Sequence, residues 1–253
     1  MERLSAFLLA LLITCLIGGV FFLTSNLSKS QKENAILGRV IDGDTLELTD
    51  GRKIRLLNIN APEKSQNSHK LALNFLRKYE NKSIEIEITD VDKYRRNLAR
   101  VYTLDKKDNY LNLNLVKKGF ASKFLVDDNE LDLFKAAEAT AITSSFGMWN
   151  KSNYYGCFII DINKNKEIVV LKYVCKEVNM KNWVLKDESR KQYVFHSLVL
   201  ARYSQVILHS NSGKNNSTDL FWNSKSNIWN NDRDSLYLFD ADGGIAHYET
   251  YGY

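Results

Sequence analysis

Four short segments in the first half of the chain carry side chains that could act together on a phosphate group. Carboxylates can hold a hard cation or take up a proton, and a guanidinium offers a fork of donors that fits two phosphate oxygens at once. Each segment alone has an ordinary structural explanation, because Asp-Gly turns form hairpins and charged residues coat surfaces. The segments are DGDT at 42–45, Arg55, NAPE at 60–63 and KYRR at 93–96.

Alternating β-like runs and turn signals surround these segments. The runs ILGRVI, TLELT and KIRLLNI are separated by two Asp-Gly turns, and SIEIEIT and NLARVYTL follow. Helical spacing of apolar residues predicts helices over about residues 68–79, 111–118 and 130–146, and Gly119 stops the second. Five short strands with interspersed helices predict a small Greek-key β-barrel of the OB type.

Taken in this order and with these intervals, the segments resemble the staphylococcal nuclease family, the thermonuclease-like domain. The matching strings lie between Ile41 and Trp149 and are IDGDT, RLLNINAPE, DKYRRNLARVY, KKGFA and MW. The resemblance implies that residues 35–150 form an OB-fold barrel with three helices. It also implies a calcium-dependent phosphodiesterase that cuts DNA and RNA.

The resemblance assigns a Ca²⁺ site to the segments before and after Arg55. Asp44 stands at the family's first ligand position, and Asn60 stands where the staphylococcal enzyme has an aspartate. An amide oxygen can coordinate Ca²⁺, but the site loses one negative charge, so weaker binding is expected. Ala61 would contribute its backbone carbonyl as a ligand. Asp42 would not bind the ion itself but would modify the properties of the residues that do.

The same resemblance implies a catalytic set of Arg55, Glu63 and Arg96. Hydrolysis of a phosphodiester needs a positioned water and relief of the charge on the phosphate oxygens. Glu63 would orient or deprotonate the water, and the only proline of the chain, Pro62, would fix the turn that aims it. The two arginines would hold the phosphate and stabilise the charge that builds on it.

Substrate contacts follow the family pattern only in part. Lys93 and Tyr94 match positions that contact the terminal phosphate of a bound nucleotide. Two tyrosines that line the nucleotide pocket of the staphylococcal enzyme are replaced by Leu125 and Asp127, which removes base stacking worth about 1–3 kcal/mol. Arg95 replaces a family glycine and adds positive charge beside Arg96.

The composition changes after Trp149, where short strands alternate with polar turns to the end of the chain. This spacing predicts an immunoglobulin-like β-sandwich over residues 151–253. The strings NMKNWVLKDES, QYVFHSLVL and DLFWNSKSNIWNNDRDSLYLFDADGGIAHY resemble a lamin-tail domain, which is appended to many secreted microbial nucleases. The resemblance implies an accessory binding domain for a ligand that the sequence does not name.

An apolar leader and two cysteines indicate the cellular compartment in which the protein works. Residues 6–23 (AFLLALLITCLIGGVFFL) are long enough to cross a bilayer, so residues 1–25 are expected to be a signal-anchor helix or a cleaved signal peptide, followed by a polar tether at 26–34. Either one exports the domains, to the outer face of the membrane or into the medium. Cys157 and Cys175 flank a polar turn, so they are expected to form a disulfide or to remain two buried thiols.

Composition excludes several classes of protein and leaves three functions open. The 253 residues carry a net charge of +5, with 44% hydrophobic and 26% charged residues, which excludes disordered and collagen-like chains and permits a polyanionic partner. The four histidines are scattered and are expected to be surface or turn residues, so a histidine-based nuclease finds no support. Beside a monomeric exported nuclease, we keep a non-cleaving OB-fold nucleic-acid-binding module and an envelope adhesion protein as alternatives.

Overall fold

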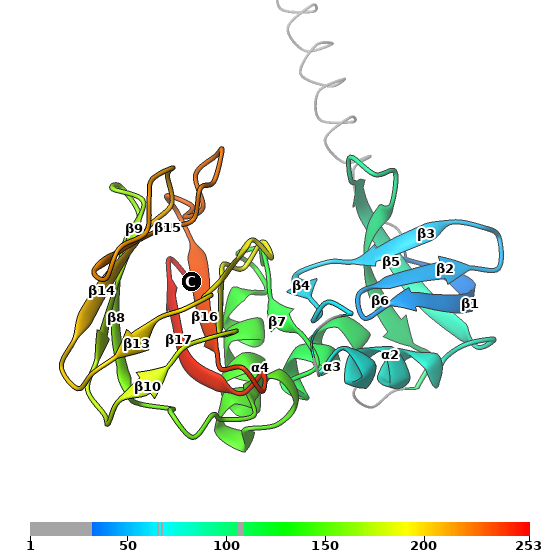
Figure 1. Ribbon diagram of the computed structural model, residues 1–253. Helices are drawn as coiled ribbons and strands as arrows, with labels where there is room; N and C mark the ends of the chain where they lie inside the picture. The colour runs from blue at the N-terminus through cyan, green and yellow to red at the C-terminus, as the bar shows by residue number, and fades with distance from the viewer. Residues whose placement is uncertain (1–31, 65, 67, 106–108) are drawn as a thin grey trace, which may run out of the picture.

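A computed structural model describes residues 32–64, 66, 68–105 and 109–253, which form a β-barrel unit followed by a β-sandwich unit. Figure 1 shows the barrel on the right and the sandwich on the left, with helix α4 between them. The described part is mainly β with three α-helices. The predicted fold class is confirmed in this respect.

Five strands close the barrel in the order β1-β2-β3-β6-β5. All neighbouring strands are antiparallel except β3 and β6, which run parallel. Apolar side chains that alternate along the strands fill the interior, and Leu37, Leu46, Ile54, Ile84 and Val101 have no exposed surface. The strands are β1 (Lys32–Asp42), β2 (Thr45–Leu48), β3 (Lys53–Leu56), β5 (Ser83–Val91) and β6 (Asn97–Thr103).

Three helices and a two-stranded ladder complete this unit. Helices α2 (His69–Arg77), α3 (Leu111–Lys117) and α4 (Leu131–Ser144) lie within a few residues of their predicted bounds. Two very short strands, β4 (Ile59–Asn60) and β7 (Ser122–Lys123), pair antiparallel outside the barrel. One run, KIRLLNI, was predicted from the sequence where the structure has β3 and β4, because nothing in the apolar pattern marks the break between the two strands.

Two four-stranded sheets form the second unit, in the orders β12-β11-β16-β17 and β15-β14-β9-β8, with a small β10-β13 ladder beside them. Both sheets contribute to one buried core, which includes Trp183 and Trp229. The strands are β8 (Phe158–Asn163), β9 (Ile168–Tyr173), β10 (Val178–Asn179), β11 (Val184–Lys186), β12 (Gln192–Val194), β13 (Val199–Leu200), β14 (Gln205–His209), β15 (Asp219–Phe221), β16 (Asp234–Phe239) and β17 (Ile245–Tyr251).

Strands β8 and β9 form an antiparallel hairpin that begins and ends at the two cysteines. Phe158 pairs with Tyr173 at the open end of the hairpin. Just beyond this pair, Cys157 and Cys175 are joined by a disulfide whose Cα atoms lie 5.3 Å apart. The disulfide therefore closes the end of the hairpin opposite its turn.

A third hydrophobic core joins the barrel unit to the sandwich. Trp149 of the 3₁₀ turn η1 (Gly147–Trp149) is 1% exposed and packs against Tyr237 and Tyr248 of the sandwich, with ring centroids 5.9 and 4.8 Å apart. Beside it, the Lys123 ammonium lies 2.5 Å from the Glu138 carboxylate and 2.8 Å from the Tyr248 hydroxyl. An apolar core and a buried charge network fix the two units against each other.

Two predictions concern the start of the chain. Strand β1 begins at Lys32, inside the stretch 26–34 predicted as a tether, because residues 32–36 pair with β5 and Lys32 forms a 2.7 Å ion pair with Glu85. The predicted leader over residues 1–25 lies outside the described residues. Within residues 32–253, apart from the gaps given above, no helix is long and apolar enough to cross a bilayer.

Candidate active site

Arg55 and Asp44 form a buried ion pair where β2 and β3 lie side by side. Arg55 pairs with Thr45 in the ladder, and the Leu56 N–H donates to the Asp44 carbonyl at 2.9 Å. The Arg55 Nη2 lies 3.3 Å from the Asp44 Oδ2, and its Nη1 donates to the Leu56 carbonyl at 2.5 Å. Only 7% of Arg55 and 2% of Asp44 are exposed, so the surrounding chain fixes both charges.

The surroundings of Asp44 keep it ionised. Burial alone would raise the pKa of its carboxyl, but the charges of Arg55 and Arg190 oppose this. Hydrogen bonds from the Ala61 N–H and the Thr45 hydroxyl act in the same direction, and the pKa lies below its ordinary value. Burial lowers the pKa of the Arg55 guanidinium from a value that is far above neutrality.

Asn60 is held by the β4–β7 ladder directly beside this pair. It lies opposite Ser122 in the ladder, and its side-chain Oδ1 accepts a hydrogen bond from the Arg55 Nη2. The next residue, Ala61, donates its N–H to the Asp44 Oδ2 at 3.2 Å. The residues that the family resemblance assigns to the cation site therefore lie together around Asp44.

Two side chains that the sequence analysis did not assign to the site hold the turn that carries Glu63. Gln66 Oε1 accepts a hydrogen bond from the Glu63 N–H at 2.9 Å. His69 Nδ1 lies 3.0 Å from the Pro62 carbonyl and 3.3 Å from an Asp42 carboxylate oxygen. His69 was expected to be a surface or turn residue; it is instead buried, with 8% of its surface exposed, at the first position of helix α2.

Arg96 is positioned by the turn between β5 and β6. Asp92 accepts hydrogen bonds from the main-chain N–H groups of Tyr94 and Arg96, and its Oδ2 binds the Arg96 Nε at 2.8 Å. The Arg96 Nη1 also donates to the Thr45 hydroxyl at 3.2 Å. Arg95 adopts a φ of 62°, a conformation that glycine takes without strain, which explains why the family has a glycine there.

Arg55 and Arg96 line one cavity of about 830 Å³. Its wall also contains Lys93, Tyr94, Leu125 and residues 57–60, and its charged residues are four cations and Asp92. Such a lining suits an anion of phosphate type. Of the two residues that replace the family tyrosines, Leu125 lies on the wall, whereas Asp127 is 2.5 Å from the Arg100 guanidinium and does not line the cavity.

The fourth cation of the cavity, Arg190, comes from the sandwich. It lies in the turn between β11 and β12, and its guanidinium reaches the barrel loop. One nitrogen, Nη1, lies 2.5 Å from the Glu63 Oε1. The other, Nη2, donates to the Asp44 Oδ2 and lies 3.3 Å from the Asn60 Oδ1.

The oxygens of Asp44, Asn60 and Glu63 thus converge on one positive group. Carboxylate and amide oxygens are donors that hard cations such as Ca²⁺ prefer, so this donor set fits a divalent ion. In the described part of the chain, no three His, Cys, Asp or Glu side chains cluster as a metal site, which agrees with the amide at residue 60. Glu63 does not line the cavity, but its carboxylate contacts Arg190, which does.

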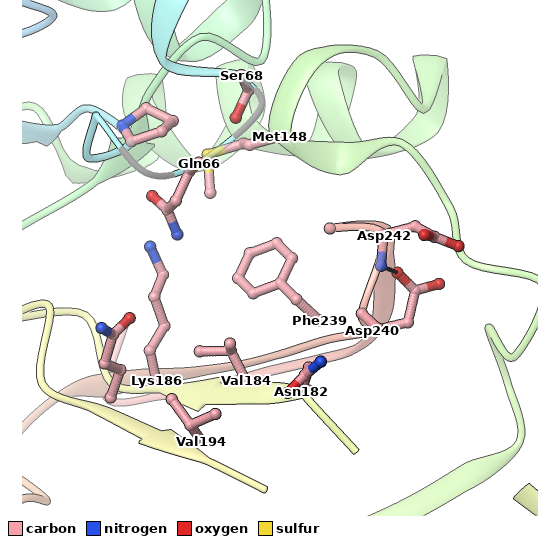
Figure 2. A pocket seen from close by; sticks show the side chains of 14 residues that line it. Gln66, Ser68, Met148, Asn182, Val184, Lys186, Val194, Phe239, Asp240 and Asp242 are labelled. Carbon is pink, nitrogen blue, oxygen red and sulfur yellow. Dashed lines mark hydrogen bonds between the residues drawn. The ribbon is translucent and has the colours of Figure 1, made fainter. Parts of the chain in front are cut away.

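A second, smaller pocket of about 300 Å³ lies between the two units next to Pro62. Figure 2 shows Lys186 of β11 extending from the sandwich toward Gln66 of the barrel unit, with Phe239 near the centre. The Lys186 ammonium lies over the rings of Tyr237 and Phe239, 5.1 and 5.6 Å from their centroids. Burial lowers the pKa of Lys186 to about 8.

Comparison with known proteins agrees with this geometry. The family model described as staphylococcal nuclease homologue matches residues 53–151, and the model of the lamin tail domain matches residues 162–253. A protein of Haemophilus influenzae described as an uncharacterized endonuclease is 31% identical over 150 residues, which cover 56% of this chain and 80% of that protein.

A protein of Escherichia coli with the same description is 37% identical over 87 residues, 33% of this chain. The match covers 56% of the Escherichia coli protein, so the chain spans about half the length of this relative. The resemblance seen in the sequence is confirmed for both units. The chain belongs to the staphylococcal nuclease family and carries a lamin tail domain after its nuclease-like barrel.

Proposed function

We propose that the chain is a nuclease that hydrolyses phosphodiester bonds of DNA and RNA in the barrel cavity. The observation that carries this proposal is the presence of Arg55 and Arg96 on one cavity wall, each held in place by its own carboxylate. Two guanidinium forks can hold the oxygens of a single phosphate. Family membership and the description of the relatives as endonucleases support the same reaction class.

Both guanidinium groups are ordered before a substrate arrives. Asp44 holds Arg55 and Asp92 holds Arg96, so little reorganisation is needed when negative charge builds on the phosphate. Lys93 lies at the same wall and would attract the neighbouring backbone phosphates. Tyr94 is 67% exposed beside it, and its ring can contact a bound nucleotide.

Glu63 is the proposed base that takes a proton from the attacking water. Its main chain is fixed by Gln66, while its side chain is 46% exposed and can turn toward the cavity. In the described arrangement Arg190 holds its carboxylate, so accepting a proton requires that this contact be released.

We propose Ca²⁺ as the cofactor. Asp44, Asn60 and the backbone carbonyl of Ala61 would hold it, with Asp42 tuning the site through His69 and the turn. When bound, a divalent ion relieves charge on the phosphate oxygens and makes water a better nucleophile. The neutral amide of Asn60 predicts weaker binding than a site with an aspartate there.

Cleavage of denatured DNA by the full chain tests the proposal. Reactions contain Ca²⁺ or a chelator, and Glu63→Gln and Glu177→Gln are run in parallel; Glu177 is an exposed glutamate of the sandwich. We expect Ca²⁺-dependent cleavage that falls by about 100-fold or more in Glu63→Gln and is unchanged in Glu177→Gln. Undiminished cleavage by Glu63→Gln would refute the assignment of the base.

A nucleic-acid-binding module that does not cut is the second candidate. It is favoured by one observation, namely that Arg190 binds oxygens of the proposed cation site and the carboxylate of Glu63. The same assay separates the two candidates. Tight binding of single strands without any cleavage in Ca²⁺ would support the binding module.

We also propose that the protein is exported, either anchored in the membrane or released. The disulfide between Cys157 and Cys175 supports an oxidising compartment. Fractionation of cells that express the full chain gives the test. Recovery with membranes indicates an anchor, a shortened form in the medium indicates a cleaved leader, and a cytosolic protein with free thiols contradicts export.

A further inference from the structure

We propose that Arg190 of the sandwich is an internal cation that competes with a divalent ion for the oxygens of Asp44 and Asn60 and holds Glu63 while it does so. The inference rests on the cation site of the proposed function. It makes the second domain a control on the site rather than a separate binding unit. Cation binding would then be linked to release of the turn between β11 and β12.

The contacts of Arg190 carry the proposal. Both terminal nitrogens of its guanidinium are bound by barrel side chains, Nη1 by Glu63 and Nη2 by Asp44 and Asn60. Its Nε is buried and has no hydrogen-bond partner. These contacts hold both ends of the guanidinium against barrel oxygens, although Arg190 borders the cavity.

Both polar atoms of the Asn60 side-chain amide contact the same turn. Its Oδ1 faces Arg190, and its Nδ2 donates to the Glu188 carbonyl at 2.7 Å. An aspartate has no hydrogen to donate and would place a negative charge against that carbonyl. The departure of residue 60 from the family pattern thus matches the presence of the sandwich turn.

The turn is built to present Arg190. The Asp187 carboxylate accepts hydrogen bonds from the Lys191 N–H at 2.7 Å and the Ser189 hydroxyl at 2.5 Å. Arg190 has a φ of 78°, in the left-handed region that ordinary residues rarely adopt. Arg190 keeps this unfavourable backbone conformation while its guanidinium contacts three acceptors, so the contacts with the barrel offset the cost of the conformation.

A divalent ion and Arg190 cannot both bind the same oxygens. Two positive groups within contact distance repel each other, so a divalent ion bound at these oxygens disfavours the guanidinium there. The ion must displace Arg190. The free energy needed to break the Arg190 contacts lowers the apparent affinity of the site for the ion. Displacement also releases Glu63, so occupation of the cation site and freeing of the base become one event.

Calorimetric titration of the full chain with CaCl₂ tests the competition without any nucleic acid. The variants are Arg190→Gln and, as a matched control, Lys191→Gln, which removes the same charge from the neighbouring exposed residue of the turn. We expect Arg190→Gln to bind Ca²⁺ about tenfold more tightly than the parent, and Lys191→Gln to stay within about twofold. Equal or weaker binding by Arg190→Gln, or no binding by any of the three proteins, overturns the proposal.

Amide hydrogen exchange on the unmutated chain tests it without a variant that could misfold. Adding saturating CaCl₂ should increase exchange at residues 188–191 and leave the β16–β17 hairpin unchanged. Unaltered exchange in the turn at Ca²⁺ saturation overturns the proposal. Because neither readout uses cleavage, tighter Ca²⁺ binding by Arg190→Gln in a chain that never cuts DNA would refute the nuclease assignment and leave the competition standing.

Discussion

Asp44 is the residue on which the stability of the site depends most. Its carboxylate, 2% exposed, balances the buried charge of Arg55 and accepts a hydrogen bond from Ala61. A buried ion pair contributes little net free energy, but removal of one partner leaves an uncompensated charge in the interior. The pair therefore fixes the geometry of Arg55 more than it stabilises the fold.

Asp44→Asn is accordingly expected to lower the free energy of unfolding by about 3 kcal/mol, because Arg55 remains buried without its carboxylate. Urea denaturation followed by circular dichroism measures this change. Glu47→Gln, in the exposed pair of Arg39 and Glu47, is the control and should leave the midpoint nearly unchanged. Equal effects of the two substitutions would show that the pair of Asp44 and Arg55 does not behave as a buried ion pair.

At this scale, most of the residues that the structure brings together around Asp44 and Arg55 were named in the sequence analysis. Arg55, Arg96, Asp44 and Asn60 come from segments with local turn and strand signals. Barrel closure brings the first three together, and the β4–β7 ladder holds Asn60 beside them. Gln66 and His69 were missed, because a residue that fixes a turn through its main chain has no motif of its own.

Among the elements, the turn between β11 and β12 concentrates buried acids. Asp187 has no exposed surface and Glu188 is 2% exposed, and Asp234 of β16 lies next to them. Burial raises the pKa of Asp187 to about 6 and that of Glu188 to about 7, and the charge of Asp234 adds to both shifts. The element that presents Arg190 is thus less stable when its acids ionise.

We expect stability to decrease with rising pH because of Asp187. Its ordinary pKa is 3.8 and its folded pKa about 6, so between these values the folded chain holds more protons than the unfolded chain. The free energy of unfolding should fall by roughly 2 kcal/mol more in the parent than in Asp187→Asn between pH 4.5 and 7. Urea denaturation at both pH values tests this, and parallel pH profiles of parent and variant would contradict it.

Elements with a strong alternation of apolar and polar residues could be predicted from the sequence, whereas elements defined by tertiary pairing could not. The five barrel strands and three helices follow apolar periodicity and turn residues. Strands β4 and β7 have two residues each and exist only because their backbones meet. The first residues of β1 are polar, and only their pairing with β5 makes them a strand.

For the whole molecule, the contact between the two units brings a turn of the sandwich to the barrel site. Trp149 lies in a core shared by both, and the buried network of Lys123, Glu138 and Tyr248 spans the boundary. This rigid contact places Arg190 in the barrel site. It could not be predicted from the sequence, because Arg190 lies 146 positions from Asp44 and belongs to a separately recognisable domain.

The two units should therefore unfold in one transition. All three described α-helices belong to the barrel unit, so circular dichroism at 222 nm follows the barrel. The four tryptophans stand at or after Trp149, so their fluorescence follows the sandwich and the boundary. Coincident urea curves from the two signals are expected, and two separated transitions would show that the units are independent.

The most direct test of the account is a crystal structure of the full chain with a short single-stranded oligonucleotide whose linkages resist hydrolysis. We predict one backbone phosphate in the barrel cavity, with the guanidinium groups of Arg55 and Arg96 both within hydrogen-bonding distance of its oxygens. A strand bound elsewhere, or a phosphate in the cavity that neither arginine contacts, would contradict the proposed active site.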